Sequence, residues 1–256
     1  MRTRLLAIAA AAALAALVVP APAHASHSWN GYHWARTSNP FTVKLGDNVS
    51  SGWDGHLATA SSDWSKSTVL DTTVVAGQAG SPRRCRPTTG RVEVCNTTYG
   101  NTGWLGIASI WVTGGVHITQ GTVKLNDTYF NTPTYNTSAW RQLVVCQEVG
   151  HTFGLDHQDE NFDNPNLGTC MDYTRDPSTN QHPNQHDYDE LVTIYSHLDS
   201  FTTVGQPVST HPSAMTDSPA SWGALVRGSA ASHGVATYVR DLGHGDMIIT
   251  FVVWAS

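Results

Sequence analysis

Charged residues are scarce in this sequence. Lys, Arg, Asp and Glu make up 13% of its 256 residues, and the 20 acidic residues outnumber the 14 basic ones, so that the formal net charge is −6. Proteins that bind nucleic acid or an anionic membrane surface through phosphate contacts need positively charged patches. We therefore expect neither nucleic acid nor a membrane among the partners.

Long apolar runs are also lacking, except at the start of the chain. Arg2 and Arg4 precede an apolar segment that runs from Leu5 to Val19, and residues 23–25 read Ala-His-Ala. This order is typical of a secretory signal peptide with its cleavage site. A membrane anchor is the alternative, but the segment is shorter than the roughly 20 apolar residues that span a bilayer. We predict that residues 1–25 are a signal peptide and that the protein is secreted and extracellular.

The sequence has no internal repeat and no GxSxG motif, which disfavours a repeat architecture and a nucleophile-elbow hydrolase. Cysteine is rare as well, with four residues in all. An even number of cysteines in an exported chain suggests two disulfides, for which three pairings are possible. The part that follows residue 25 is long enough for one sizeable core, or for one domain with an appendage.

One stretch carries a recognisable chemical pattern. Residues 144–157 read VVCQEVGHTFGLDH, in which Gln147, Glu148, His151, Gly154 and His157 follow the pattern QExxHxxGxxH. Residues four apart lie on the same face of an α-helix, so Gln147 and His151 would point into one cleft with Glu148 beside them. Gly154 can adopt left-handed backbone angles that end the helix and bring His157 back.

This stretch resembles the signature of the metzincin zinc proteases, HExxHxxGxxH followed by a Met-turn. The downstream residues Cys170, Met171, Asp172 and Tyr173 are similar to such a turn, and Gln147 stands where the family has its first histidine.

The resemblance implies a Zn²⁺ cofactor with Gln147, His151 and His157 as its ligands. It also implies that Glu148 is the general base and that Tyr173 approaches the metal or steadies the oxyanion, while Met171 forms the floor of the site. A glutamine presents a neutral oxygen from the same helical face, although oxygen is a poorer zinc donor than imidazole nitrogen. Two alternatives to Gln147 stay open: His182, His186 or a water completes the ligand set, or the site is silent.

The resemblance bears on the cysteines too. Pairing Cys146 with Cys170 would tie the metal-binding helix to the Met-turn, and pairing Cys85 with Cys95 would close a short loop. As an alternative, residues 82–85 (PRRC) are faintly similar to the zinc-blocking cysteine switch of matrixin propeptides, although Cys85 would lie inside the catalytic domain.

The expected fold is α/β (α+β), namely a metzincin-like catalytic domain over residues 26–202. Its mixed, twisted sheet has about five strands and is accompanied by two long helices. Alternation and helical periodicity predict strands at 41–45, 69–75, 103–113 and 116–125, helices at 54–64 and from 137 onward, and a loop at 83–102. Asp187 and Glu190 have the spacing of an N-cap pair and predict a further helix. Residues 203–256 are predicted as a linker and a β-hairpin extension with strands at 237–240 and 247–254.

The resemblance also implies the function. In metzincins an edge strand pairs with an extended substrate, and the resemblance assigns Gly106–Ile110 to that place; the plainer interpretation is an ordinary core strand. The leading hypothesis is a secreted zinc endopeptidase, acting as a monomer on protein or peptide substrates by a metal-activated water with Glu148 as base. The alternative is a catalytically silent module of the same shape that binds a peptide or protein partner.

Overall fold

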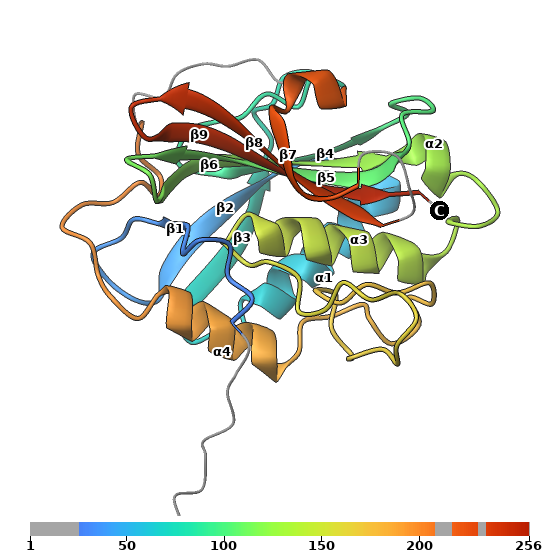
Figure 1. Ribbon diagram of the computed structural model, residues 1–256, viewed down its shortest axis with the longest axis horizontal. Helices are drawn as coiled ribbons and strands as arrows, with labels where there is room; N and C mark the ends of the chain where they lie inside the picture. The colour runs from blue at the N-terminus through green and yellow to red at the C-terminus, as the bar shows by residue number, and fades with distance from the viewer. Residues whose placement is uncertain (1–25, 208–216, 230–233, 256) are drawn as a thin grey trace, which may run out of the picture.

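A computed structural model describes residues 26–207, 217–229 and 234–255, so the predicted signal peptide lies outside the described residues. A single mixed sheet of nine strands forms the larger layer, and the long helices lie against one of its faces (Figure 1). Within the described ranges, no helix is long and apolar enough to cross a membrane.

The strand order is β3-β2-β4-β6-β5-β9-β8-β7, and β1 pairs with β6 outside this path. Strands β1 to β4 and β6 pair in parallel, whereas β5, β9, β8 and β7 continue the sheet in antiparallel fashion. The strands are β1 (His33–Trp34), β2 (Phe41–Asn48), β3 (Leu70–Ala76), β4 (Val92–Thr97), β5 (Trp104–Thr113), β6 (His117–Asn126), β7 (Ala224–Gly228), β8 (Val235–Gly243) and β9 (Asp246–Trp254).

The helices are α1 (Ser51–Trp64), α2 (Asp127–Phe130), α3 (Ser138–His151) and α4 (Gln185–Ile194), with the 3₁₀ turn η1 (Pro219–Ser221). The main core lies between the sheet and the helices α1 and α3. Trp64 of α1 is fully buried there and donates its indole N–H to the Cys146 carbonyl of α3 at 3.1 Å. A smaller cluster around Trp104, Trp222 and Trp254 covers the other face of the antiparallel strands.

The predicted elements agree with the structure in part. The strands at 41–45, 69–75, 103–113 and 116–125, the helices at 54–64 and from 137, and the C-terminal hairpin are all present. The expected strand number of about five is too low, and the predicted loop at 83–102 contains β4. Glu93 of β4 is buried and paired with Arg91 at 2.9 Å. These two charged residues give a central strand the composition of an exposed loop. Helix α4 begins after Asn184, which forms a capping box with Asp187, rather than at Asp187.

The C-terminal hairpin adds to the same sheet. Strand β9 pairs with β5 along its length, from Trp104 opposite Trp254 to Val112 opposite Met247. The expectation that Gly106–Ile110 forms a substrate-binding edge is therefore wrong for this structure, because β5 has β6 on one side and β9 on the other. Alternate residues of β9, Ile249, Phe251 and Val253, belong to the core that includes α3, which accounts for its position.

Both predicted disulfides are present. Cys85 is bonded to Cys95, and Cys146 of α3 is bonded to Cys170 of the predicted Met-turn. The alternative of a zinc-blocking thiol at Cys85 is wrong, since its sulfur is in the disulfide.

The N-terminal segment closes the C-terminal end of α3. The last carbonyls of an α-helix have no partner within the helix and need one from outside. Trp34 donates its indole N–H to the carbonyl of Thr152, the C-cap residue, at 2.9 Å, and in the turn beyond the helix the Trp29 amide donates to the Gly154 carbonyl at 3.1 Å. Gly154 has a φ of 93°, and the Tyr32 carbonyl oxygen occupies the space where a Cβ would stand. Position 154 therefore needs glycine for two reasons: its backbone is left-handed, and a side chain would collide with the Tyr32 carbonyl.

Replacing Gly154 with Ala should lower the free energy of unfolding by about 3 kcal/mol or more, because about 1–3 kcal/mol of backbone strain is joined by an overpacking cost of similar size. Gly80→Ala is the matched control, since Gly80 has a φ of 75° with no atom near its missing Cβ. Urea denaturation of both variants measures the difference. Equal losses would show that the Tyr32 contact contributes nothing.

Candidate metal site on helix α3

Helix α3 carries the predicted site in its last two turns. Thr137 caps the helix by accepting a hydrogen bond from the Trp140 amide at 3.2 Å. From residue 142 onward every residue of the helix is buried. Gln147, Glu148 and His151 each have 0% relative exposure, so the polar end of α3 lies inside the protein.

His151 has the state that a metal ligand needs. Its Nδ1 lies 2.9 Å from the Leu155 carbonyl oxygen, and because a carbonyl only accepts, Nδ1 carries the hydrogen. Burial, followed by repulsion from His157, lowers the pKa of His151 to about 3, so the ring is neutral. Its Nε2 is buried and has no hydrogen-bond partner among the described residues. The Nε2 lone pair is therefore free.

Gln147 reproduces this arrangement with an amide. Its Nε2 donates to the Cys170 carbonyl at 2.9 Å, which assigns the other amide atom, Oε1, as the free one. Oε1 is buried without a hydrogen-bond partner in the part of the chain that is described. Like a neutral histidine, Gln147 offers one N–H to a backbone carbonyl and one lone pair to another group.

His157 lies beside His151, with their ring centroids 4.4 Å apart, but its nitrogens are engaged. The Tyr173 hydroxyl lies 2.5 Å from its Nε2, and Nδ1 lies 3.4 Å from a carboxylate oxygen of Asp156. Burial lowers the pKa of His157, but Asp156 and Glu160 outweigh it and raise the pKa above its usual value. The structure thus brings His157 and Tyr173 to the predicted site in contact with each other.

Glu148 lies under the sheet at β5. Both carboxylate oxygens are buried, and within the described residues neither makes a hydrogen bond of ordinary length and angle. A Cβ on Gly106 would stand 2.6 Å from Oε1 of Glu148, so the glycine provides the space for this side chain. Burial raises the pKa of Glu148 well above its usual value, and the Ala108 backbone offsets this only in part.

Strand β9 covers these side chains. The Phe251 ring stacks on the His151 ring with centroids 4.3 Å apart and an interplanar angle of 4°. A cavity of about 20 Å³ beside Gln147 and Tyr173, lined on one side by Val253 and Trp254, has room for about one water molecule. In this structure the site is closed to a peptide.

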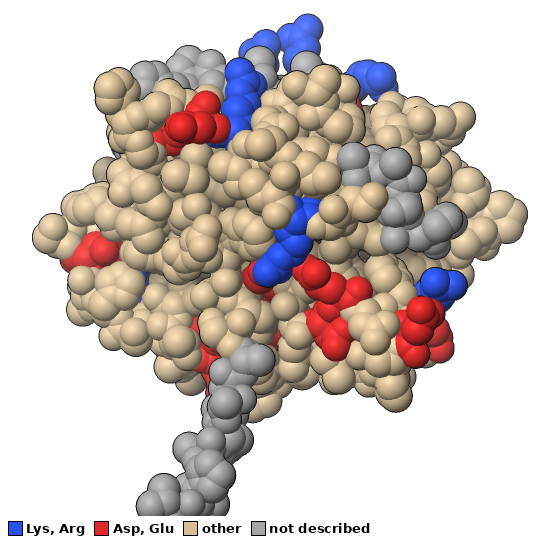
Figure 2. Space-filling model, viewed as in Figure 1, with Lys and Arg blue, Asp and Glu red and all other residues tan. Residues whose placement is uncertain are grey.

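A charged cluster, which the sequence did not indicate, borders the site. Arg227 of β7 contacts the carboxylates of Asp156 and Glu160, the latter at 3.1 Å, and its guanidinium lies 4.8 Å from the centre of the Trp29 ring. Although burial acts in the opposite direction, His157 and Arg227 lower the pKa of Asp156 to about 2. Figure 2 shows blue and red atoms side by side near the middle of this face, with further charged groups toward its rim. The cluster joins the C-terminal strands to the loop that bears His157.

The remaining predicted residues have clear positions. The Met171 sulfur packs against Gly150 of α3, in agreement with a floor beneath the helix. His182 lies 2.6 Å from an Asp63 carboxylate oxygen, and His186 stacks on His27 at 4.8 Å. Neither contact involves Gln147, His151 or His157.

The donor set fits a transition-metal ion. A buried lone pair without a partner costs about 1–3 kcal/mol, and here Gln147 Oε1 and His151 Nε2 both lack one in the described structure. Imidazole nitrogen and amide oxygen are both acceptable to Zn²⁺, with nitrogen preferred. His157 offers its Nε2 as a donor only if the Tyr173 hydroxyl, 2.5 Å away, moves aside.

The sequence matches no protein-family model and no curated protein. Among solved structures, the chain is similar to high choriolytic enzyme 1, a hatching enzyme zinc-protease from Oryzias latipes (medaka fish), with 12% identity and a TM-score of 0.36 over 64% of this chain and 94% of the other. It is also similar to myroilysin, with 14% identity and a TM-score of 0.35 over 67% of this chain and 87% of the other. Likeness at this level is too weak to assign an activity.

Proposed function

We propose that the protein is a secreted, zinc-dependent endopeptidase of the metzincin type. The observation that carries this proposal is the set of buried lone pairs without partners on α3, next to a buried carboxylate. Two disulfides accord with an extracellular location, because such bonds persist in oxidising environments. Protein or peptide is the proposed substrate, and the monomer the proposed form.

In this proposal Gln147, His151 and His157 hold the ion. Bound zinc supplies Lewis acidity, which polarises a carbonyl and lowers the pKa of water. Glu148 takes a proton from the attacking water and delivers it to the leaving amine. The Tyr173 hydroxyl donates a hydrogen bond to the developing oxyanion. Substrate can enter only when β9 moves away from His151.

The second candidate is the silent binding module. The stacking of Phe251 on His151 and the pairing of β9 with β5 favour it, because both occupy positions that a substrate would need. The two candidates differ in whether the closed site opens.

Glu148→Gln should abolish proteolysis while zinc content stays that of the parent, because the base is lost and no ligand is. General-base catalysis contributes about 10²–10⁴-fold, so we expect a loss of that order. Hydrolysis of a denatured protein substrate and metal analysis of the same samples measure both quantities. Residual activity near that of the parent would remove Glu148 from the chemistry.

Gln147→Ala should lose zinc affinity, whereas Gln147→His should raise it, because nitrogen replaces a weaker oxygen donor. Gln142→Ala is the matched control, since Gln142 lies on the same helix, is buried and hydrogen-bonds His56 instead. Zinc titration against a competing chelator gives the affinities. Unchanged affinity in Gln147→Ala would show that Gln147 is no ligand.

Phe251→Leu should raise the activity and speed the removal of zinc by chelator, because the ring that covers His151 is gone. Val252→Ala controls for lost packing on β9, since Val252 faces the opposite cluster around Trp254. Specific activity and zinc-release rates distinguish the candidates. If parent and Phe251→Leu are both inert, the silent module replaces the enzyme.

A further inference from the structure

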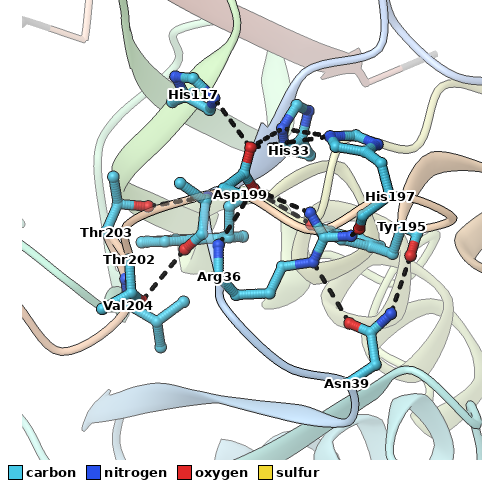
Figure 3. Close-up of polar contacts among 12 residues, drawn as sticks. His33, Arg36, Asn39, His117, Tyr195, His197, Asp199, Thr202, Thr203 and Val204 are labelled. Carbon is cyan, nitrogen blue, oxygen red and sulfur yellow. Dashed lines mark hydrogen bonds and ion pairs between the residues drawn. The ribbon is translucent and has the colours of Figure 1, made fainter.

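Three histidine rings converge on one carboxylate oxygen in a second place, separate from the residues of the α3 site (Figure 3). The Nε2 atoms of His117, His33 and His197 lie 3.3, 3.6 and 3.8 Å from Oδ1 of Asp199. The Nε2 atoms of His33 and His197 lie 3.1 Å from each other. These side chains come from β1, from the start of β6 and from the segment after α4.

The hydrogen on His33 can be assigned. Its Nδ1 lies 2.7 Å from the Gly31 carbonyl oxygen and must donate to it, because a carbonyl only accepts. His33 is 4% exposed, and burial, opposed in part by the Gly31 carbonyl and Asp199, lowers its pKa. With Nδ1 donating, a neutral His33 ring directs its Nε2 lone pair toward the Asp199 carboxylate and the Nε2 of His197. A hydrogen on Nε2 of His197 can satisfy this lone pair, and so can a cation placed beside the Asp199 carboxylate.

The spacing fits one metal ion. Ligands about 2.0–2.2 Å from a tetrahedral zinc lie roughly 3.3–3.5 Å from one another. Oδ1 of Asp199 lies 3.3 Å from Nε2 of His117 and 3.6 Å from Nε2 of His33, close to that value. The donors of His33, His117 and Asp199 all lie within 4.8 Å of one another.

The surroundings hold the carboxylate in this orientation. Oδ2 of Asp199 accepts from the Arg36 amide at 3.1 Å and from the Arg36 guanidinium at 3.0 Å, so Oδ1 is left for the histidines. Asn39 in turn accepts from Nε of Arg36 at 3.3 Å. Backbone or carboxylate partners of this kind orient the ligands of known metal sites.

We propose that His33, His117 and Asp199 bind a divalent transition metal, with Zn²⁺ the best chemical match. Three donors come from the protein, as in zinc sites that keep one position for a water. The ion would join β1, β6 and the segment after α4, and would thereby fix the N-terminal segment that closes the end of α3.

The test is the amount of Zn²⁺ bound by the purified protein and by His117→Gln. The His117 side chain is 20% exposed, so its replacement should not prevent folding, which circular dichroism checks. His244→Asn is the matched control, because His244 is an exposed histidine in the β8–β9 turn with a φ of 57°, which asparagine tolerates. We expect His117→Gln to bind one equivalent fewer than the parent, or to bind that equivalent at least about 100-fold more weakly, and the control to match the parent.

This difference is independent of the α3 site. If both sites bind, the count falls from two to one; if the α3 site binds nothing, it falls from one to zero. Co²⁺ gives a second readout, since its visible absorption reports four-coordinate binding, and Asp199→Asn should weaken it as His117→Gln does. Folded variants with the parent's metal content and cobalt spectrum would overturn the proposal.

Discussion

The antiparallel pairing of β9 with β5 is the contact on which the site depends. It buries β5, whose Gly106 lies against the Glu148 side chain. It also places the Phe251 ring on the His151 ring. With water excluded, the pKa of Glu148 rises, the pKa of His151 falls, and each lone pair without a partner becomes costly. The same pairing therefore prepares the donors for a cation and keeps a peptide out. The proposed enzyme requires this pairing to open, whereas the proposed binding module does not.

Much of the fold could be predicted from the sequence, because alternation and helical spacing are local signals. The helix of the motif, the left-handed turn at Gly154 that follows it and the hairpin at residues 237–254 all follow from such patterns. Strand β4 was missed because its buried Glu93 is neutralised by Arg91, and one sequence shows no sign of which charges are paired. The pairing partner of β9 was missed because register between distant strands is a tertiary property.

The candidate site was predictable to a similar degree. The positions of Gln147, Glu148 and His151 on one buried helix end follow from the motif, and the structure places them there. The alternation of Ile249, Phe251 and Val253 showed that these side chains share a face, but not that this face meets His151. No local signal marks Arg227, and the cluster around Asp199 combines three segments that are far apart in the chain. Contacts of this kind become visible only when the fold brings the segments together.

The α3 site and the cluster around Asp199 share one arrangement. In each, a backbone carbonyl accepts a hydrogen bond from one atom of the side chain, and the lone pair on its other polar atom stays available. This holds for His151 with Leu155, Gln147 with Cys170 and His33 with Gly31. The most direct test of the α3 site is anomalous diffraction at the zinc absorption edge from crystals of the protein supplied with Zn²⁺. The account predicts a peak within bonding distance of Gln147 Oε1 and His151 Nε2. A zinc-loaded crystal without density at those atoms would contradict it.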